Sequence, residues 1–355
     1  MSEQRTFFIR EILKSEHLDG VLILGLPNMR YLSGFTGTDG ALFVGADESI
    51  FMTDSRYCEQ AREQVEVGRI VCYKDKLKAI GDLLDGSSVQ RIGFEAEAVN
   101  VALYNDLIAL NPSVTWLPLK EQIRSLRGKK SEAELIHLQK AADLNHQAFD
   151  TVLPLIKAGQ SERDIALELE FTLKKLGGEA NAFDFIVASG ARGALPHGVA
   201  SEKKLAQGEL VTIDFGTRVQ GYHSDETVTL AIGEIDGNLR QIFDIVLEAH
   251  DLAIRAVYPG CSIVDLDAVA RDYIKLKGYG AYFGHGLGHG VGLEIHEFPG
   301  LSSRSQEVLA EGMVVTIEPG IYLPGQGGVR IEDTIVVTPD GCRLLTSIPK
   351  QYRQV

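Results

Sequence analysis

The pattern of apolar residues changes once along the chain, between residues 111 and 131, and this change predicts two domains. In the first part, short apolar runs alternate with helix-like stretches, the runs at 20–26, 41–44 and 50–53 and the stretches at 4–17, 55–66 and 97–110. Such alternation is typical of a mixed or parallel sheet with helices on its faces. The length of 355 residues agrees with two domains, because single hydrophobic cores stop growing at about 250–300 residues.

A polar, proline-containing segment marks the boundary between the two parts. Asn111-Pro112 and Pro118 interrupt the apolar pattern, and a basic stretch from Arg124 to Lys130 follows. Segments of this kind are typical of domain boundaries. We therefore predict a smaller α/β domain over residues 1–124 and a larger domain over residues 125–355.

The larger domain begins with two helix signals and continues mainly as strands. Ser131 followed by Glu134, and Ser161 followed by Asp164, are capping boxes that predict the beginnings of two helices. Gly177-Gly178 predicts the end of the second helix. Further helices are expected near 238–256 and 262–277, between segments with strand character. A helix pair followed by many strands predicts an α+β domain.

The composition of the chain argues against several classes of protein. The chain carries 49 acidic and 35 basic residues, a formal net charge of −14, which argues against nucleic-acid binding. No apolar stretch approaches the roughly 20 residues that span a bilayer, so no membrane partner is expected. The N-terminal segment is charged throughout, and the four cysteines, at positions 58, 72, 261 and 342, are scattered without a CxxC pair. We therefore expect free thiols and a cytoplasmic location.

A strand–turn–strand segment over residues 209–232 brings two acidic residues together. Asp214 and Asp225 face each other if the turn is centred between Val219 and Gln220. Their Cβ atoms would then be about 4.5–5.5 Å apart on one face of the sheet. Because like charges repel and Asp is a poor strand former, a positive group is expected between them.

A second hairpin repeats this arrangement. Reflection about Gly325 pairs Glu318 with Glu332, again within strongly apolar strands. One such pair could be accidental, but two pairs in one domain indicate a site. A solvent-facing role is a stronger alternative for Asp225, which lies in a polar run, than for the other three acids.

Histidines add a nitrogen ligand. His285, His289 and His296 lie close together in a glycine-rich segment that disfavours a helix. For His285 an incidental position in a flexible loop is as plausible as a function, whereas His289 and His296 are better candidates. His197 is a fourth candidate on a turn. Four carboxylates with one imidazole form a hard ligand set that suits Mn, Fe, Co or Zn, and four negative charges balance two divalent ions about 3.5–4 Å apart.

The motifs around these residues resemble the pita-bread metallopeptidase family, which includes prolidase, aminopeptidase P and methionine aminopeptidase. The matching segments are Ile213–Gly216, Ser224–Thr227, Gly284–His289, Glu294–Glu297, Thr316–Gly320 and Arg330–Asp333. In the first part, Asn28–Gly37 and Thr53–Tyr57 resemble the creatinase-like N-terminal domain. Methionine aminopeptidase lacks that domain, so the resemblance favours the proline-specific branch. One departure is Val228, which stands where the family often has Arg, and it puts fine substrate preference or metal tuning in question.

The resemblance implies a pita-bread catalytic domain and the role of each site residue. The five ligands of two divalent ions per subunit, with manganese favoured and Co, Fe or Zn as alternatives, would be Asp214, Asp225, His289, Glu318 and Glu332. A hydroxide bridging the ions would attack the carbonyl of an Xaa-Pro bond in a dipeptide or at a peptide N-terminus. Glu318 would also carry a proton.

Four further residues would bind the substrate or orient a ligand. By resemblance, His296 would hydrogen-bond the scissile carbonyl, and His197 would orient the substrate from the opposite side. Arg330 shares a strand face with Glu332, so it would orient that carboxylate or hold a substrate group. Arg304 would bind the substrate carboxylate, with a surface salt bridge as the alternative. The resemblance also implies a homodimer.

Several alternatives stay open. A dipeptidase and an aminopeptidase fit the motifs equally well. A non-proline aminopeptidase, or a creatinase-like amidinohydrolase that needs no metal, could use the same fold. A non-enzymatic binding module of this fold is a further alternative, although the retention of all five ligand types argues against it.

Overall fold

The structure is a computed structural model that describes residues 2–66, 68–85 and 88–355. Contacts within the chain divide it into two units, Met1–Arg127 and Gly128–Val355. The two units share no sheet, and each has apolar core residues of its own. The boundary that the sequence predicts after residue 124 is close to this division and stays a prediction.

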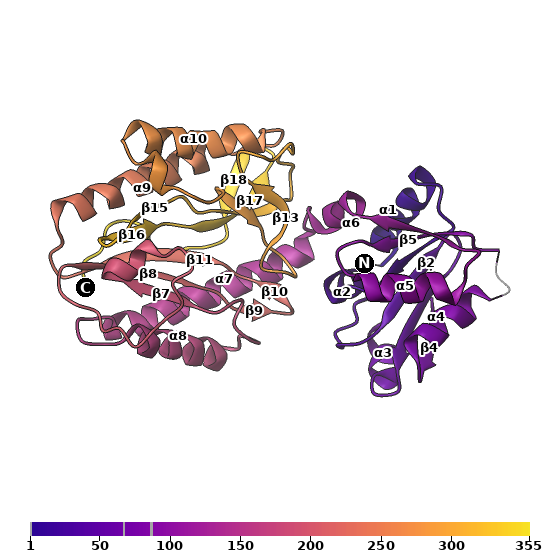
Figure 1. Ribbon diagram of the computed structural model, residues 1–355. Helices are drawn as coiled ribbons and strands as arrows, with labels where there is room; N and C mark the ends of the chain where they lie inside the picture. The colour runs from indigo at the N-terminus through magenta and orange to yellow at the C-terminus, as the bar shows by residue number, and fades with distance from the viewer. Residues whose placement is uncertain (1, 67, 86–87) are drawn as a thin grey trace. The chain divides into compact units, whose positions relative to one another are not determined.

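The N-terminal unit is built on one mixed sheet with the strand order β4-β3-β2-β1-β5-β6. Its strands are β1 (Gly20–Ile23), β2 (Ala41–Gly45), β3 (Ser49–Asp54), β4 (Arg69–Tyr73), β5 (Arg91–Glu95) and β6 (Thr115–Leu119). Its helices are α1 (Ser2–Ser15), α2 (Leu26–Ser33), α3 (Cys58–Gln64), α4 (Lys76–Leu84), α5 (Val101–Leu110), α6 (Glu121–Arg124) and a 3₁₀ turn η1 (Ser125–Arg127). The mixed sheet with helices around it is the α/β arrangement expected for this part (Figure 1).

Helix α2 is absent from the sequence prediction. The predicted strand 20–26 ends early, at Ile23, because the carboxylate of Glu95 accepts hydrogen bonds from the backbone N–H groups of Leu24 and Gly25. The same carboxylate accepts a bond from the Asn28 side chain in the first turn of α2. Glu95 lies far along the sequence, so this strand end depends on a tertiary contact.

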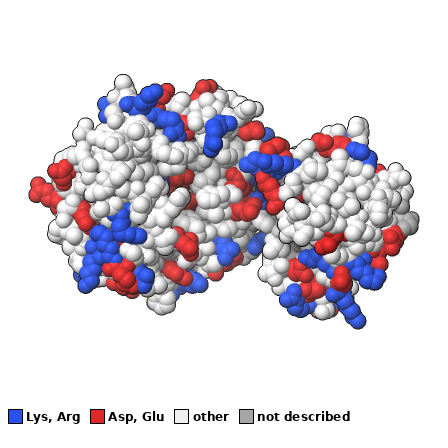
Figure 2. Space-filling view, viewed as in Figure 1, with Lys and Arg blue, Asp and Glu red and all other residues white. Residues whose placement is uncertain are grey.

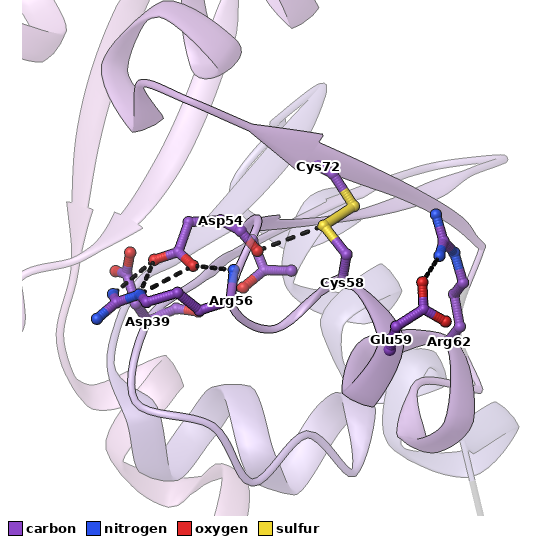
Figure 3. The surroundings of a disulfide bond; sticks show 8 residues. Asp39, Asp54, Arg56, Cys58, Glu59, Arg62 and Cys72 are labelled. Atoms are coloured by element: carbon purple, nitrogen blue, oxygen red, sulfur yellow. Dashed lines mark hydrogen bonds and ion pairs between the residues drawn. A yellow bond between two sulfur atoms is a disulfide. The ribbon is translucent and has the colours of Figure 1, made fainter.

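The prediction of four free thiols is wrong for two of them. Cys58 and Cys72 form a disulfide, with their Cα atoms 5.9 Å apart (Figure 3). Cys58 is the first residue of α3, which begins shortly after β3 ends, and Cys72 belongs to β4, the strand that pairs with β3. The two cysteines are therefore neighbours in the fold. Cys261 and Cys342 are free thiols, as expected. The cysteine argument for a reducing compartment therefore does not hold.

The C-terminal unit has strands between two pairs of helices (Figure 1). Its helices are α7 (Glu132–Val152), α8 (Glu162–Leu176), α9 (Gly237–Arg255) and α10 (Ile263–Leu276), with 3₁₀ turns η2 (Leu153–Leu155), η3 (Gly190–Ala194) and η4 (Gly280–Tyr282). Its strands are β7 (Ile186–Ser189), β8 (Glu209–Phe215), β9 (Arg218–Val219), β10 (Tyr222–His223), β11 (Glu226–Ile232), β12 (Gly288–Gly290), β13 (Glu297–Leu301), β14 (Val314–Ile317), β15 (Gly320–Leu323), β16 (Gly327–Arg330), β17 (Asp333–Thr338) and β18 (Gly341–Leu344). The α+β prediction for this part is therefore confirmed.

The strands form a three-stranded sheet β11-β8-β7, a five-stranded sheet β13-β12-β14-β17-β18 and two short pairs, β9–β10 and β15–β16. One core packs α7 and α8 against β7, β8, β9 and β11, and a second packs α9 and α10 against β13, β14, β15, β16 and β17. Both predicted capping boxes form, at Ser131 with Glu134 and at Ser161 with Asp164. Gly177 ends α8 in the left-handed conformation, as its position after the helix predicts.

The predicted register of the first hairpin is wrong. Asp214 pairs with Thr227 and not with Asp225. Asp225 comes immediately before the first residue of β11. The turn is centred one residue later than expected, because Gln220 and Gly221 both take positive φ angles, of 48° and 75°. Positive φ at both central residues defines a type I′ turn, and a shift of its centre by one residue moves the register by two.

The second hairpin has the predicted register. β14 pairs with β17, matching Ile317 with Asp333, and β15 pairs with β16, matching Gly320 with Arg330. Both pairings belong to the same register, whose continuation matches Glu318 with Glu332 in the gap between the two strand pairs. The two acids therefore lie where the hairpin crosses from one sheet to the next.

The surface of the chain carries charged side chains of both signs (Figure 2). Acidic and basic side chains are interspersed on the visible face of each unit (Figure 2). In the part of the chain that the structure describes, none of the helices has both the length and the apolar character needed to cross a bilayer.

Candidate metal centre and substrate pocket

A pocket of about 420 Å³ lies in the C-terminal unit, at the ends of strands from both larger sheets. The five residues predicted as metal ligands all line it, together with His197, His296 and Arg330. Residues from positions 183 to 332 therefore meet in one cavity. Arg304 is not among the lining residues; it lies on an exposed turn, where its backbone N–H donates to the Ser302 hydroxyl.

Three predicted ligands form a group tight enough to hold one ion. Asp225, His289 and Glu332 each offer a ligand atom, and these atoms lie within 4.8 Å of one another. Glu318 joins them, since its Oε1 is 3.4 Å from Nε2 of His289. The same Nε2 is 3.5 Å from Oδ2 of Asp225. Four of the five predicted ligands therefore point at a common space.

The imidazole of His289 has the tautomer that a metal ligand needs. Its Nδ1 lies 3.1 Å from the carbonyl oxygen of Gly290, which can only accept a hydrogen bond, so we assign the proton to Nδ1. Nε2 then carries a lone pair and faces one oxygen each of Asp225 and Glu318, which in their ionised form also only accept. A cation between these three acceptors satisfies all of them.

Asp214, the fifth predicted ligand, has one oxygen held and one unpaired. Its Oδ2 accepts a 2.6 Å hydrogen bond from the guanidinium of Arg330. Its Oδ1 is buried and has no hydrogen-bond partner among the described residues. A buried unpaired carboxylate oxygen is costly. Together with the hard oxygen and nitrogen donor set, this orphan atom fits a site for divalent metal ions.

Burial and mutual repulsion oppose ionisation of the acids when no cation is bound. Burial, followed by the charges of Glu332 and Asp214, raises the pKa of Asp225 well above its usual value. Burial, followed by Glu318 and Asp214, does the same to the pKa of Glu332. Burial raises the pKa of Glu318 to about 7. Without a bound cation these carboxyls therefore hold protons more tightly than free carboxyls do, and metal ions displace those protons on binding.

Burial acts on the histidines in the opposite sense. It lowers the pKa of His289 to about 3, with a further contribution from His296, and the pKa of His296 is lowered as well. The two rings lie 4.2 Å apart, centroid to centroid, and nearly perpendicular. Both imidazoles are therefore neutral at pH 7, the form that ligates a metal or hydrogen-bonds a carbonyl.

Hydroxyl groups from the strands orient two of the carboxylates. The Thr227 hydroxyl donates to Glu332 over 2.6 Å, and the Thr316 hydroxyl donates to Glu318 over 3.2 Å. Thr227 belongs to the first hairpin and Glu332 to the second, so this bond joins the two acid-bearing hairpins. Contacts of this kind set the direction of a ligand's lone pairs.

Arg330 contacts a different acid from the one that strand alternation predicts. Its guanidinium donates to Asp214, to the Tyr322 hydroxyl and to the backbone carbonyl of Pro196, and not to Glu332. Arg330 and Glu332 both line the pocket, as the alternation predicts, but the Thr227 hydroxyl lies between them, accepting from Nε of Arg330 and donating to Glu332. Val228, which replaces the family's usual Arg, is buried in the core of the α7–α8 side.

Tyr322 and the apolar lining residues were missed by sequence reasoning. The Tyr322 hydroxyl lies 2.9 Å from Nε2 of His285, so His285, which the sequence left undecided, also faces the pocket. Tyr322 lies two residues after Gly320, and period-two alternation from Glu318 was a signal that could have found it. The apolar lining residues are Phe183, Ile186, Val199 and Ile295. They come from segments that are separate in the sequence, so no local sequence pattern predicts them.

Comparison with known proteins agrees with this architecture. Residues 137–339 match metallopeptidase family M24, and residues 7–128 match the creatinase/prolidase N-terminal domain. An Xaa-Pro dipeptidase from Pyrococcus horikoshii is 39% identical, over 97% of each chain. The structure superposes on an Xaa-Pro dipeptidase from Bacillus anthracis with a TM-score of 0.97, at 40% identity and full coverage of both chains. An X-Pro aminopeptidase from Thermotoga maritima has a TM-score of 0.88 at 36% identity, over 96% of this chain and 100% of that one.

The fold and the pocket thus define a two-domain metallopeptidase. The chain belongs to metallopeptidase family M24, with a creatinase/prolidase N-terminal domain preceding the catalytic domain. The family resemblance and the fold class that the sequence predicts are confirmed.

Proposed function

We propose that the chain is a dinuclear metal-dependent peptidase that hydrolyses Xaa-Pro bonds in dipeptides or at peptide N-termini. The observation that carries this proposal is the convergence of Asp225, His289 and Glu332 within 4.8 Å in a pocket that Glu318 and Asp214 also line. The printed activities of the relatives from Pyrococcus horikoshii and Bacillus anthracis support the choice of substrate.

The metal ligands in this proposal are Asp214, Asp225, His289, Glu318 and Glu332. Divalent ions held there would supply a hydroxide nucleophile at neutral pH and polarise the attacked carbonyl. Glu318, hydrogen-bonded by Thr316, would accept and return a proton. Arg330 would hold Asp214 in place, because the buried guanidinium of Arg330 donates a hydrogen bond to the Asp214 carboxylate.

The substrate would be bound by imidazoles and by an apolar wall. His296 and His197 both line the pocket and would hydrogen-bond the scissile carbonyl and the substrate backbone. Phe183, Ile186 and Val199 offer an apolar surface that suits a proline ring. Arg304 lies outside the lining residues, so its proposed contact with the substrate carboxylate has no support from the pocket.

The test is hydrolysis by purified, metal-stripped protein. Ala-Pro should be cleaved after Mn²⁺, Co²⁺ or Zn²⁺ is added, and Ala-Ala and Met-Ala much more slowly. Asp214→Ala and Glu318→Ala should abolish this activity. A wild-type protein that binds two divalent ions but cleaves none of the Xaa-Pro peptides would contradict the substrate proposal. Hydrolysis of a guanidino compound without any metal, and of no Xaa-Pro peptide, would favour the amidinohydrolase alternative.

An Xaa-Pro aminopeptidase is the second candidate, because the Thermotoga maritima X-Pro aminopeptidase shares the fold at 36% identity. Comparison of kcat/KM for Ala-Pro and for Ala-Pro-Xaa peptides of increasing length separates the two. A dipeptidase loses activity as soon as a third residue is added, whereas an aminopeptidase gains or retains it.

Three further features are part of the proposal. Manganese is proposed as the physiological metal, a homodimer as the assembly and the cytoplasm as the location. Metal analysis after chelator-free purification tests the first. Sedimentation of the purified protein tests the second, and cell fractionation the third.

A further inference from the structure

A second cluster of charged side chains is buried beside the candidate metal centre. Its members are Glu226, His250, Asp333 and Lys350, which are 0%, 3%, 3% and 8% exposed. Two of them are next in sequence to proposed ligands, because Glu226 follows Asp225 and Asp333 follows Glu332. None of the four is among the site residues that the sequence predicts.

The cluster faces away from the substrate pocket. Asp225 and Glu332 line that pocket, whereas Asp333 lines a separate cavity of about 330 Å³ together with His250 and Lys350. Successive side chains in extended backbone point to opposite sides, so each ligand and the acid after it face opposite ways. A shift of Glu226 or Asp333 would therefore move the ligand to which it is joined by one peptide bond.

Lys350 holds both acids at once. Its Nζ is 2.6 Å from Oε1 of Glu226 and 3.3 Å from Oδ1 of Asp333. Glu226 belongs to the first hairpin and Asp333 to the second. One ammonium group thus bridges the two segments that present metal ligands.

The neighbouring C-terminal residues add to this bridge. The backbone N–H of Ile348 donates to Oε1 of Glu226 over 3.0 Å, and the Thr346 hydroxyl donates to Asp333 over 2.6 Å. On the ligand side, the Thr334 hydroxyl donates to the backbone carbonyl of Asp225 over 2.8 Å. Residues 346–350 therefore contact both hairpins behind the ligands.

The charges explain why the bridge is needed. Glu226 and Asp333 are buried like charges, and in a medium of low polarity they repel unless a cation lies between them. His250 contacts only one of the acids, since its Nε2 is 3.3 Å from Oδ2 of Asp333. Lys350 is the cation shared by the two. Without it, repulsion would drive the two hairpins apart and widen the spacing of Asp225 and Glu332.

We propose that Lys350 is a positioning residue for the metal centre, which sets the separation of Asp225 and Glu332 by holding Glu226 and Asp333 from behind. This inference rests on the proposed metal site. It assigns a role in metal affinity to residues 346–350, which do not line the substrate pocket.

Metal titration of the full-length protein tests the inference. Lys350→Met should weaken Mn²⁺ binding by about 10–100-fold, the usual effect of removing a group that orients metal ligands. It should also change the visible absorption spectrum of the Co²⁺-loaded protein, because the ligand geometry changes. Lys350→Arg, which keeps the cation, should restore most of the affinity.

A matched control separates this effect from a general loss of an ion pair. Lys203 pairs with Glu209 over 2.6 Å in the same unit, and neither residue lines the pocket. Lys203→Met should therefore leave Mn²⁺ affinity and the Co²⁺ spectrum unchanged. A folded Lys350→Met protein with the wild-type Mn²⁺ affinity and Co²⁺ spectrum would overturn the inference.

A measurement on the wild-type protein covers the case in which Lys350→Met does not fold. Coupling between two sites is reciprocal, so if residues 346–350 favour metal binding, bound metal must stabilise these residues. Mn²⁺ should slow hydrogen exchange of the Ile348 amide more than that of Val355, whose N–H donates to Ala231 outside the cluster. Equal slowing at both amides would overturn the inference. Absence of any Mn²⁺ binding by the wild type would instead contradict the proposed function.

Discussion

Arg330 donates a 2.6 Å hydrogen bond to one oxygen of Asp214 and leaves the other oxygen of that carboxylate buried and unpaired in the pocket. The guanidinium is 3% exposed and is itself held by Tyr322 and by the backbone of Pro196. The arginine therefore neutralises part of the charge of Asp214 and directs its remaining oxygen at the proposed metal ions.

Replacement of this arginine by lysine should impair metal binding. Arg330→Lys keeps the positive charge but offers a single ammonium that cannot reach Asp214, Tyr322 and Pro196 together. We expect metal affinity to fall by about 10–100-fold and kcat/KM to fall with it. The control is Arg240→Lys, since Arg240 pairs with Asp244 on the surface of α9. Wild-type metal affinity in Arg330→Lys would show that Asp214 does not depend on this contact.

The stability of the metal-free protein should fall as pH rises from about 6.5 to 8.5. Burial raises the folded-state pKa of Glu318 to about 7 and that of Asp225 and Glu332 well above their usual values. Unfolded carboxyls have pKa values of about 4, so in this window the folded state binds more protons than the unfolded state and loses stability with rising pH.

The buried histidines act in the opposite sense, mainly below this window and in its lower part. Burial lowers the pKa of His289 to about 3 and that of His285 to about 4, so their opposing contribution is already halved at about pH 6.5 and is small above about pH 7.5, where unfolded histidines are neutral. Thermal unfolding of chelator-treated protein at several pH values measures the trend. Saturating Mn²⁺ should remove it, because the ions replace the protons. A metal-free protein whose unfolding temperature rises between pH 6.5 and 8.5 would contradict the assignment of buried facing acids.

Removal of the His296 imidazole should lower activity without removing the metal. His296 lines the pocket beside His289, but it is not in the group of three that lies within 4.8 Å. His296→Ala should keep its bound metal and lose about 10²–10³-fold in kcat, as expected for loss of one donor to a developing oxyanion. His146→Ala, on the exposed face of α7, is the control. Loss of metal together with activity would make His296 a ligand.

The disulfide should be visible by thiol counting. Denatured, unreduced protein should expose two thiols, from Cys261 and Cys342, and reduction should reveal four. Cys58→Ser with Cys72→Ser should destabilise the N-terminal unit by about 3 kcal/mol, the value for a closed loop of about 15 residues. Metal affinity should not change, since the disulfide and the metal centre belong to different units. Four thiols before reduction would contradict the bond.

Local signals in the sequence predicted much of this architecture. Capping boxes at Ser131 and Ser161 mark helix beginnings through contacts three residues apart, and period-two alternation marks the strands. The register of the second hairpin followed from a glycine-rich turn. The register of the first was missed because Gln220, with no special sequence signal, takes a positive φ angle beside Gly221.

Contacts between residues far apart in the chain could be identified only from the tertiary structure. The family motifs named Asp214, Asp225, His289, Glu318 and Glu332, but not which of their atoms converge, nor that Arg330 holds Asp214. The disulfide between Cys58 and Cys72, the contact of Glu95 with the backbone that follows β1 and the bridge made by Lys350 belong to the same class. The spacing of side chains along a strand or helix follows from backbone geometry and can be predicted from the sequence. These contacts depend on how separate elements pack against one another. That packing is determined by all the residues of the core together.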